Sequence, residues 1–149
     1  MWVITGLIGY LFVLSVYDIR FHKIPLPSLI GGSLFAVIYM LLTYREGISS
    51  LSNALNILNG WIPGIFMLIA GWATNCVGEG DGWVLLIVGS ILGAGKMTWV
   101  FSGSLLLSAI TAGTLWSFHK VKRKDQLPYI PFLTVTIMLI EIWERGGGY

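Results

Sequence analysis

Long stretches almost without charge dominate this sequence, and they limit the folds that it can adopt. Only 11% of the residues are charged and 56% are apolar, whereas soluble domains carry roughly 25% charged residues. The mean hydropathy is +0.81. Such a composition predicts an integral membrane protein whose apolar runs form transmembrane helices.

Six apolar runs are separated by breaks, and prolines account for some of the breaks. Pro25 and Pro27 end the first run, because proline lacks an amide donor and disfavours helix at the residue before it. The serine-rich segment 45–56 is expected to be a loop or an interfacial turn. Pro128 suits the start of the last helix. We therefore expect an all-α polytopic bundle of about six transmembrane helices that forms a single domain over residues 1–149. The expected helices cover residues 2–18, 27–44, 57–77, 82–96, 97–118 and 128–144.

The distribution of basic residues predicts how the chain is oriented in the cytoplasmic membrane. With six spans, the loops after the first, third and fifth spans share one side of the bilayer. Six basic residues fall on that side and three on the other, and the richer side is expected to be cytoplasmic. Both termini then face outward. The six residues are Arg20, Lys23, Lys120, Lys122, Arg123 and Lys124, and the three are Arg45, Lys96 and Arg145.

Two aspartates stand at the ends of these apolar runs. Asp18 leaves the first expected span and Asp81 enters the fourth, on the same cytoplasmic side. An ionisable group at the margin of hydrocarbon is costly, and it marks a functional site by default. Two carboxyl groups that meet there share one proton, so that one acts as a base and the other as an acid, as in aspartic proteases. Peptide hydrolysis is the reaction that this pair favours.

Three short motifs accompany the aspartates. Asp18-Ile-Arg-Phe-His-Lys-Ile-Pro25 is an acid followed by a basic stretch and Ile-Pro, and Gly78-Glu-Gly-Asp81 is a Gly-x-Gly-Asp sequence. Pro128-Tyr-Ile-Pro-Phe-Leu133 is a proline-rich segment before the last span. Together and in this order, the motifs resemble those of the type IV prepilin peptidases, membrane aspartic proteases of the Gly-x-Gly-Asp type. The resemblance covers most of the chain.

The resemblance implies an endopeptidase that removes the short basic leader from prepilins or pilin-like pseudopilins at the cytoplasmic face. Its catalytic pair would be Asp18 and Asp81. No metal or other cofactor is implied, and the expected partners are the substrate and the lipid bilayer. The residues expected to shape the site or contact the substrate are Pro25, Gly78, Glu79, Gly80, Pro128 and Pro131. Of these, Gly78 and Gly80 are expected to let the backbone bend and to admit a substrate strand close to Asp81.

Several positions depart from the family pattern. Trp83 stands where members usually have lysine, Leu26 where they have a polar residue, and Ile130 where they often have glycine. The amino-terminal extension with paired cysteines that accompanies methyltransferase activity is also missing from this sequence. We therefore expect the short form of the family, a peptidase without methyltransferase activity.

Other functions are open or excluded by particular residues. A presenilin-like intramembrane protease and a small proton-coupled carrier remain alternatives to the leader peptidase. The segment 93–97 is similar to part of a phosphate loop, but Ser90 stands at the position of the first glycine and Met97 replaces the Ser or Thr that would hold magnesium. His22 and His119 have no partner at metal-ligand spacing, and Cys76 is the single cysteine. A net charge of +2 gives no reason to expect nucleic acid, and the oligomeric state stays open.

Overall fold

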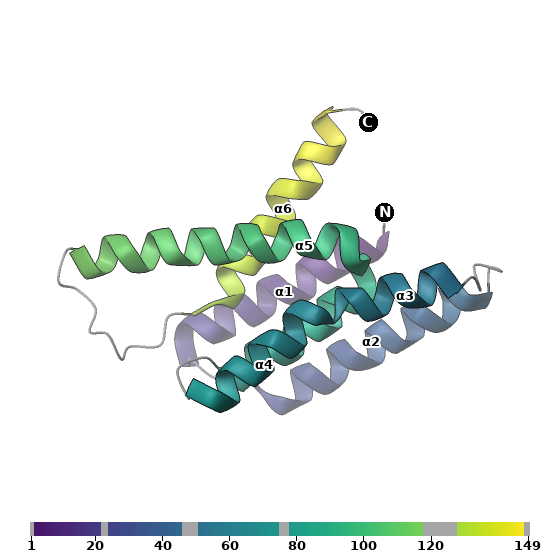
Figure 1. Cartoon of the computed structure of the whole chain (residues 1–149), viewed down its shortest axis with the longest axis horizontal. Coiled ribbons are helices and arrows are strands. Elements are labelled where there is room, and N and C mark those ends of the chain that lie inside the picture. Colours follow the sequence, from purple (N-terminus) through teal and green to yellow (C-terminus); the bar gives the residue numbers. More distant parts are fainter. Residues whose placement is uncertain (1, 22–23, 46–50, 75–77, 118–127, 148–149) are drawn as a thin grey trace. The chain divides into compact units, whose positions relative to one another are not determined.

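Helices make up every element of the computed structural model, which describes residues 2–21, 24–45, 51–74, 78–117 and 128–147. Figure 1 labels them in chain order. The helices are α1 (Trp2–Phe21), α2 (Leu26–Arg45), α3 (Leu51–Gly60), α4 (Ile62–Thr74), α5 (Glu79–Ser117) and α6 (Ile130–Gly147). The predicted all-α class is therefore confirmed for the described part of the chain.

By length and composition, four stretches of the described helices can cross a membrane, not six. They are Val3–Phe21, Leu26–Thr43, Ala54–Ala73 and Gly80–Leu115. The third combines α3 and α4, and the fourth joins two predicted spans into one element. Helix α6 is missing from this set because Glu141, Glu144 and Arg145 lie close together in its second half, and charges at the centre of a span are costly.

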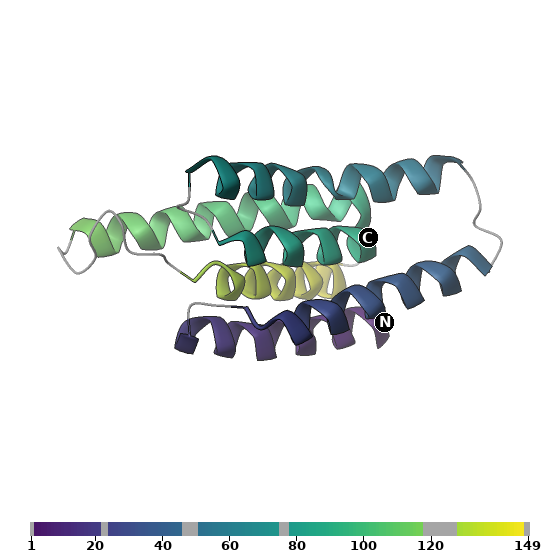
Figure 2. The same ribbon diagram turned by 90° about the horizontal axis from the view of Figure 1, so that it is seen from below.

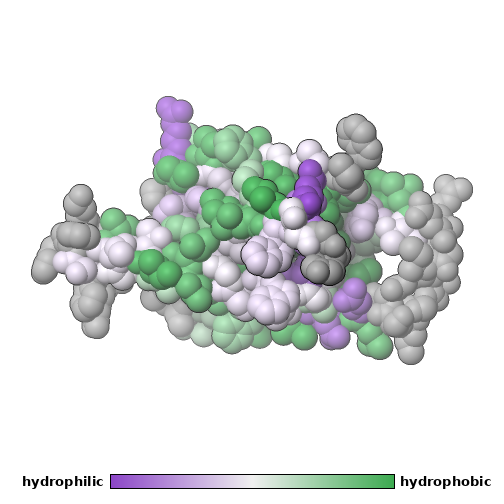
Figure 3. All heavy atoms as spheres, turned by 90° about the horizontal axis from the view of Figure 1, so that it is seen from above, coloured by the Kyte–Doolittle hydropathy of each residue, from purple (hydrophilic) through white to green (hydrophobic). Residues whose placement is uncertain are grey.

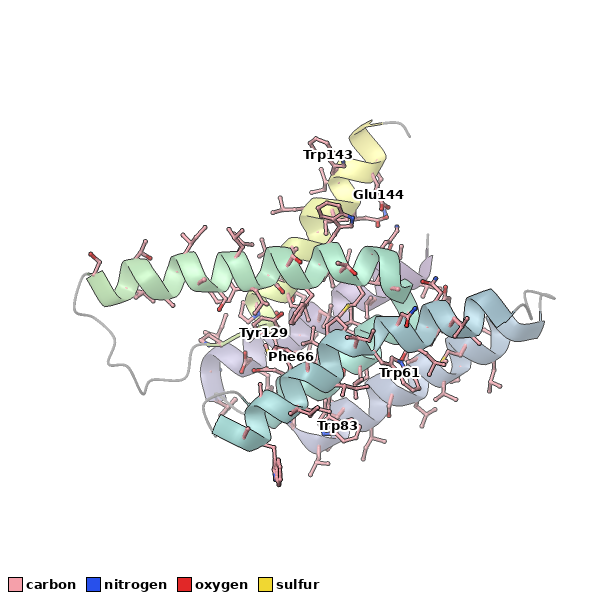
Figure 4. All side chains as sticks on the ribbon, viewed as in Figure 1. Trp61, Phe66, Trp83, Tyr129, Trp143 and Glu144 are labelled. Atoms are coloured by element: carbon pink, nitrogen blue, oxygen red, sulfur yellow. The ribbon has the colours of Figure 1, made fainter. Side chains whose placement is uncertain are left out.

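Large apolar side chains cover the outside of these helices, as expected where lipid replaces water. Figure 3 shows apolar side chains at the surface on the face that it presents. Trp143 lies near the carboxyl end of α6 beside Glu144 (Figure 4), where an amphipathic ring suits a headgroup layer. The most exposed of the large apolar residues include Leu26, Val13, Ile142, Trp72, Trp99 and Trp143.

By its internal contacts the chain divides into two compact units, the first formed by Met1–His22 with Val100–Tyr149 and the second by Lys23–Trp99. The predicted single peptidase domain over 1–149 stays a prediction.

In the first unit, α6 packs against α1 and against the second part of α5. The α1 face is a stripe of leucines, Leu7, Leu11 and Leu14, spaced three or four residues apart so that they share one side of the helix. On the α5 side, Thr136 of α6 lies against Gly103, where a Cβ would come within 2.7 Å of the threonine methyl group. The core of this unit is therefore built mainly from branched side chains.

In the second unit, α3 and α4 run alongside the first part of α5, as Figures 1 and 2 show. Glycines let these helices approach closely. A Cβ on Gly60 would lie 2.5 Å from the carbonyl oxygen of Gly89, and a Cβ on Gly89 would overlap the carbonyl oxygen of Gly60. Further along, Gly64 faces Leu86 and Gly82 faces Leu68. The pairing is antiparallel, and we call this contact the glycine seam.

The break inside α5 lies at Gly93. Its φ of 70° and ψ of 177° belong to a backbone region that is essentially restricted to glycine. The amide of Ala94 begins the second part of α5 and donates a hydrogen bond of 2.9 Å to Oδ1 of Asn56. Asn56 therefore acts as a helix cap supplied by α3, because the first amides of a helix have no partner within it.

Two sequence expectations are corrected by this region. The boundary expected between Lys96 and Met97 is wrong, because the helix is interrupted at Gly93 instead. The loop or turn expected over 45–56 is wrong in part, because α3 begins at Leu51. The two corrected places are in contact, because Asn56 of α3 accepts the hydrogen bond of the Ala94 amide directly after the break.

Helices α3 and α4 are separated only at Trp61. Pro63 lies in the first turn of α4 and has no amide donor, which interrupts a continuous helix at this point. Trp61 (Figure 4) donates from its indole Nε1 to Oγ of Ser90 at 2.7 Å, and Ser90 donates in turn to the carbonyl of Leu86. The break between the two helices thus lies where the glycine seam is tightest.

Candidate aspartic protease site

Asp18 lies in the first unit, on the buried stripe of α1. Its side chain is 6% exposed, and it follows Leu11, Leu14 and Ser15 on the same helix face. Oγ of Ser15, one turn before it, shares a hydrogen bond of 2.7 Å with Oγ1 of Thr134 in α6. The carboxyl group of Asp18 therefore belongs to a helix that is held in place by its packing against α6.

The proline-rich segment lies in the same unit as Asp18. Tyr129 is buried and its hydroxyl is hydrogen-bonded to Ser104 of α5. The carbonyl of Tyr129 accepts bonds from the amides of Phe132 and Leu133 at 3.1 and 3.2 Å, and this begins α6. Pro131 occupies the first turn, where a missing amide costs little. Pro128 and Pro131 thus set the start of the helix that packs on the Asp18 helix.

Asp81 lies in the second unit, in the first turn of α5. Its amide donates to the carbonyl of Gly78 at 3.1 Å, and its side chain is 9% exposed. The carboxyl group folds back over Gly78, because a Cβ on that glycine would lie 3.3 Å from Oδ2 of Asp81. A side chain at position 78 would therefore crowd the acid.

Inside the second unit, the structure brings the Ile-Pro end of the first motif against the second motif. A Cβ on Gly80 would lie 2.6 Å from Cδ1 of Ile24 and 3.1 Å from its Cβ and Cγ1. Ile24 precedes Pro25 in the first motif, and Gly80 precedes Asp81 in the second. The Ile-Pro pair of one motif therefore lies directly against the Gly-x-Gly-Asp turn of the other.

Sequence reasoning did not identify Ile24 as a site residue. The pairing of a bulky residue with a glycine more than fifty positions away leaves no periodic pattern in a single sequence. The available signal was the presence of Ile-Pro in one motif and of Gly-x-Gly-Asp in the other. A bulky side chain at a fixed position of one motif can pack against a glycine at a fixed position of the other.

Two of the three departures from the family pattern, Trp83 and Leu26, lie on the outside of the chain, whereas the third, Ile130, is fully buried at the start of α6. Trp83 is 53% exposed and Leu26 is 72% exposed, so neither substitution fills the space between Ile24 and Gly80. Glu79 begins α5, but its side chain lies outside what the structure describes, as do His22, Cys76 and His119. The described residues contain no group of three or more His, Cys, Asp or Glu side chains able to hold a metal ion.

Comparison with known proteins adds no relative to this description: no family model, curated protein or solved structure matches the chain. The assignment of a function therefore rests on the residues and contacts described above.

Proposed function

We propose that this protein is a membrane aspartic endopeptidase of the prepilin peptidase type, with Asp18 and Asp81 as its catalytic pair. The observation that carries the proposal is the contact of Ile24 with Gly80. It joins the Ile-Pro end of the first motif to the Gly-x-Gly-Asp turn of the second, next to the buried carboxyl group of Asp81. A chain that contained these motifs by chance would have no reason to pack them together.

The order of the apolar stretches supports a shared side for the two acids. Asp18 stands at the end of the first stretch and Asp81 at the start of the fourth, with Leu26–Thr43 and Ala54–Ala73 between them. Two crossings return the chain to the side from which it started. This result holds whether α5 crosses once or twice.

The finer topology is part of the same proposal. The break at Gly93 would let α5 cross twice, first over 80–92 and then over 94–117. The first of these segments spans only about 20 Å at 1.5 Å per residue, against a hydrocarbon core of about 30 Å. Asp81 would then lie below the surface of the cytoplasmic leaflet. With α6 as a further crossing, the chain would have six spans and both termini outside.

The reaction follows from two carboxyl groups that share one proton. The ionised group takes a proton from a water molecule, which attacks the scissile carbonyl carbon. The protonated group donates its proton to the carbonyl oxygen, which gives a tetrahedral intermediate. As the intermediate collapses, the first group gives the proton that it took from water to the departing amine nitrogen, and the second group recovers its proton from the hydroxyl group. A basic leader at the inner leaflet, followed by an apolar helix, is the substrate that this position fits, in a prepilin or a pilin-like protein.

The test is cleavage of a pilin-like substrate, with a basic leader, a glycine and an apolar helix, by the protein in lipid vesicles. Asp18→Asn and Asp81→Asn should each lower kcat on the order of 10²–10⁴-fold, as loss of an acid or base does. The double variant should be no worse than either single variant, because the two groups act as a unit. Glu144→Gln, in the last turns of α6, is the matched control and should cleave normally.

The products separate the alternatives. A leader peptidase cuts just before the apolar helix, and a presenilin-like protease cuts within it, so mass analysis of the product locates the bond. A proton-coupled carrier cuts neither. If the wild-type protein left the substrate intact, or if the aspartate variants cut as well as wild type, the proposal would be wrong.

A further inference from the structure

We infer that Ile24 is a positioning residue for Asp81: its side chain occupies the space that Gly80 leaves empty and thereby fixes the turn that presents the carboxyl group. The inference rests on the proposed function, because positioning matters only if Asp81 is catalytic. It assigns to the Ile-Pro pair of the first motif a role in the geometry of the second acid.

The contact is close along the whole isoleucine side chain. Its Cδ1, Cβ and Cγ1 atoms lie 2.6, 3.1 and 3.1 Å from the place where a Cβ on Gly80 would stand. Two of these atoms are near the backbone, and a β-branched side chain has little freedom at χ1. Ile24 therefore cannot move aside without moving its own backbone.

The backbone of Ile24 is itself held in place. The proline that follows restricts it to extended conformations. The carbonyl of Pro25 accepts hydrogen bonds from the amides of Ser28 and Leu29 at 3.0 and 3.4 Å, which anchors it to the first turn of α2. The backbone of Ile24 is therefore held in place, and its side chain can limit the movement of Gly80 through their contact.

The position of Gly80 is transmitted directly to the acid. Asp81 is the next residue, and its amide is bonded to the carbonyl of Gly78. Gly80 therefore lies within the short turn that Gly78 and Asp81 close. A displacement of Gly80 away from Ile24 has to rotate this turn and change the direction of the carboxyl group.

The test uses changes in side-chain size on both sides of the contact. Gly80→Ala should lower kcat on the order of 100-fold, because a misplacement of about 1 Å can cost that much. Ile24→Val and Ile24→Ala should lower kcat progressively in the presence of Gly80. In the Gly80→Ala background the order should reverse, since removal of Cδ1 and then of Cγ1 makes room for the new methyl group. Gly31→Ala, at a glycine of α2 with nothing within 4 Å of a Cβ, is the matched control.

The readout must distinguish positioning from stability. We expect the change in kcat with KM held within about twofold, and we expect Ile24→Val/Gly80→Ala and Ile24→Ala/Gly80→Ala to recover kcat stepwise. The melting temperature in detergent, measured for every variant, reports the contact without reference to activity. A loss of melting temperature with unchanged kcat would overturn the positioning role and leave Ile24 as a packing residue.

Failure of the inference differs from failure of the proposed function. If Asp18→Asn and Asp81→Asn abolish cleavage but the size order does not reverse, the function stands and the role of Ile24 is wrong. If the wild-type protein cuts nothing, the function is wrong and the role of Ile24 falls with it. The melting temperatures of the same variants then show separately whether the contact exists: their order with side-chain size at position 24 should also reverse in the Gly80→Ala background.

Discussion

The two units hold their aspartates by opposite means. In the first unit, Asp18 continues a stripe of leucines on α1, and hydroxyl groups of Ser15 and Thr134 join α1 to α6. In the second unit, Asp81 lies in the first turn of a helix that packs closely through glycines, with backbone against backbone at Gly60 and Gly89. Side chains make the contact between α1 and α6, whereas glycines let the backbones of α3 and α5 approach each other.

This difference predicts different sensitivities to substitution. A core of branched side chains loses contacts when a side chain is shortened, and the remaining helices can relax around the gap. A contact between backbones cannot relax, because an added methyl group has to push a whole helix away. We therefore expect the second unit to be damaged by added volume and the first by removed volume.

The largest effect is expected from Gly89→Ala in the glycine seam. The new Cβ would overlap the carbonyl oxygen of Gly60, and overpacking against backbone should lower the free energy of unfolding by about 3 kcal/mol. Unfolding in mixed detergent micelles measures this loss. Gly95→Ala, where nothing lies within 4 Å of a Cβ, is the control, and an equal effect of both variants would mean that the two backbones do not touch.

Gly93→Ala should follow, with a loss of about 2 kcal/mol. Its positive φ is strained for any residue with a Cβ, and the new methyl group would also meet Nδ2 of Asn56 at 2.7 Å. The same unfolding assay measures the loss. Stability equal to wild type would show that α5 runs through position 93 as an ordinary helix.

Leu11→Ala tests the first unit by removing volume, and about 1.5 kcal/mol is expected. Leu11 is fully buried, and in lipid the empty volume sets the cost, because the bilayer is as apolar as leucine. Val13→Ala on the exposed side of α1 should be nearly neutral in the same micelles. If the exposed variant lost as much stability as the buried one, the leucine stripe would not be a packing face.

The smallest effect is expected from Ser15→Ala, about 0.6 kcal/mol, the usual strength of a hydrogen bond between membrane helices. The bond to Thr134 is lost, but Thr134 keeps its bond to the carbonyl of Ile130. Ser33→Ala removes a hydroxyl that is bonded only within α2 and should cost less. A double-mutant cycle with Thr134→Val would show no coupling if the two hydroxyl groups do not interact.

The apolar runs predicted the positions of α1 and α2 well. The expected spans 2–18 and 27–44 agree with α1 and α2 to within a few residues, because the length of an apolar run sets the length of such a helix. The start of α3 was missed because its first turns are polar and amphipathic. Hydropathy records how apolar a segment is, and it does not record which partner satisfies a polar side chain.

The motifs named the residues of the candidate site, and the packing between them was out of reach. Asp18, Asp81 and the prolines are visible in the sequence as unusual residues in an apolar chain. The contact of Ile24 with Gly80 and the cap of Asn56 on Ala94 join residues that lie far apart along the chain. Such contacts depend on how the helices pack, and a single sequence does not show which distant residues are in contact.

The cap on α5 has a consequence for synthesis. Asn56 precedes Ala94 by 38 residues, so the side-chain oxygen that accepts this hydrogen bond is synthesised before the amide that donates it. The acceptor for the Ala94 amide is therefore already part of the nascent chain when the turn at Gly93 is made. A chain whose translation began after α3 would lack Asn56, and the Ala94 amide would then have no cap from α3 when the turn at Gly93 enters the bilayer.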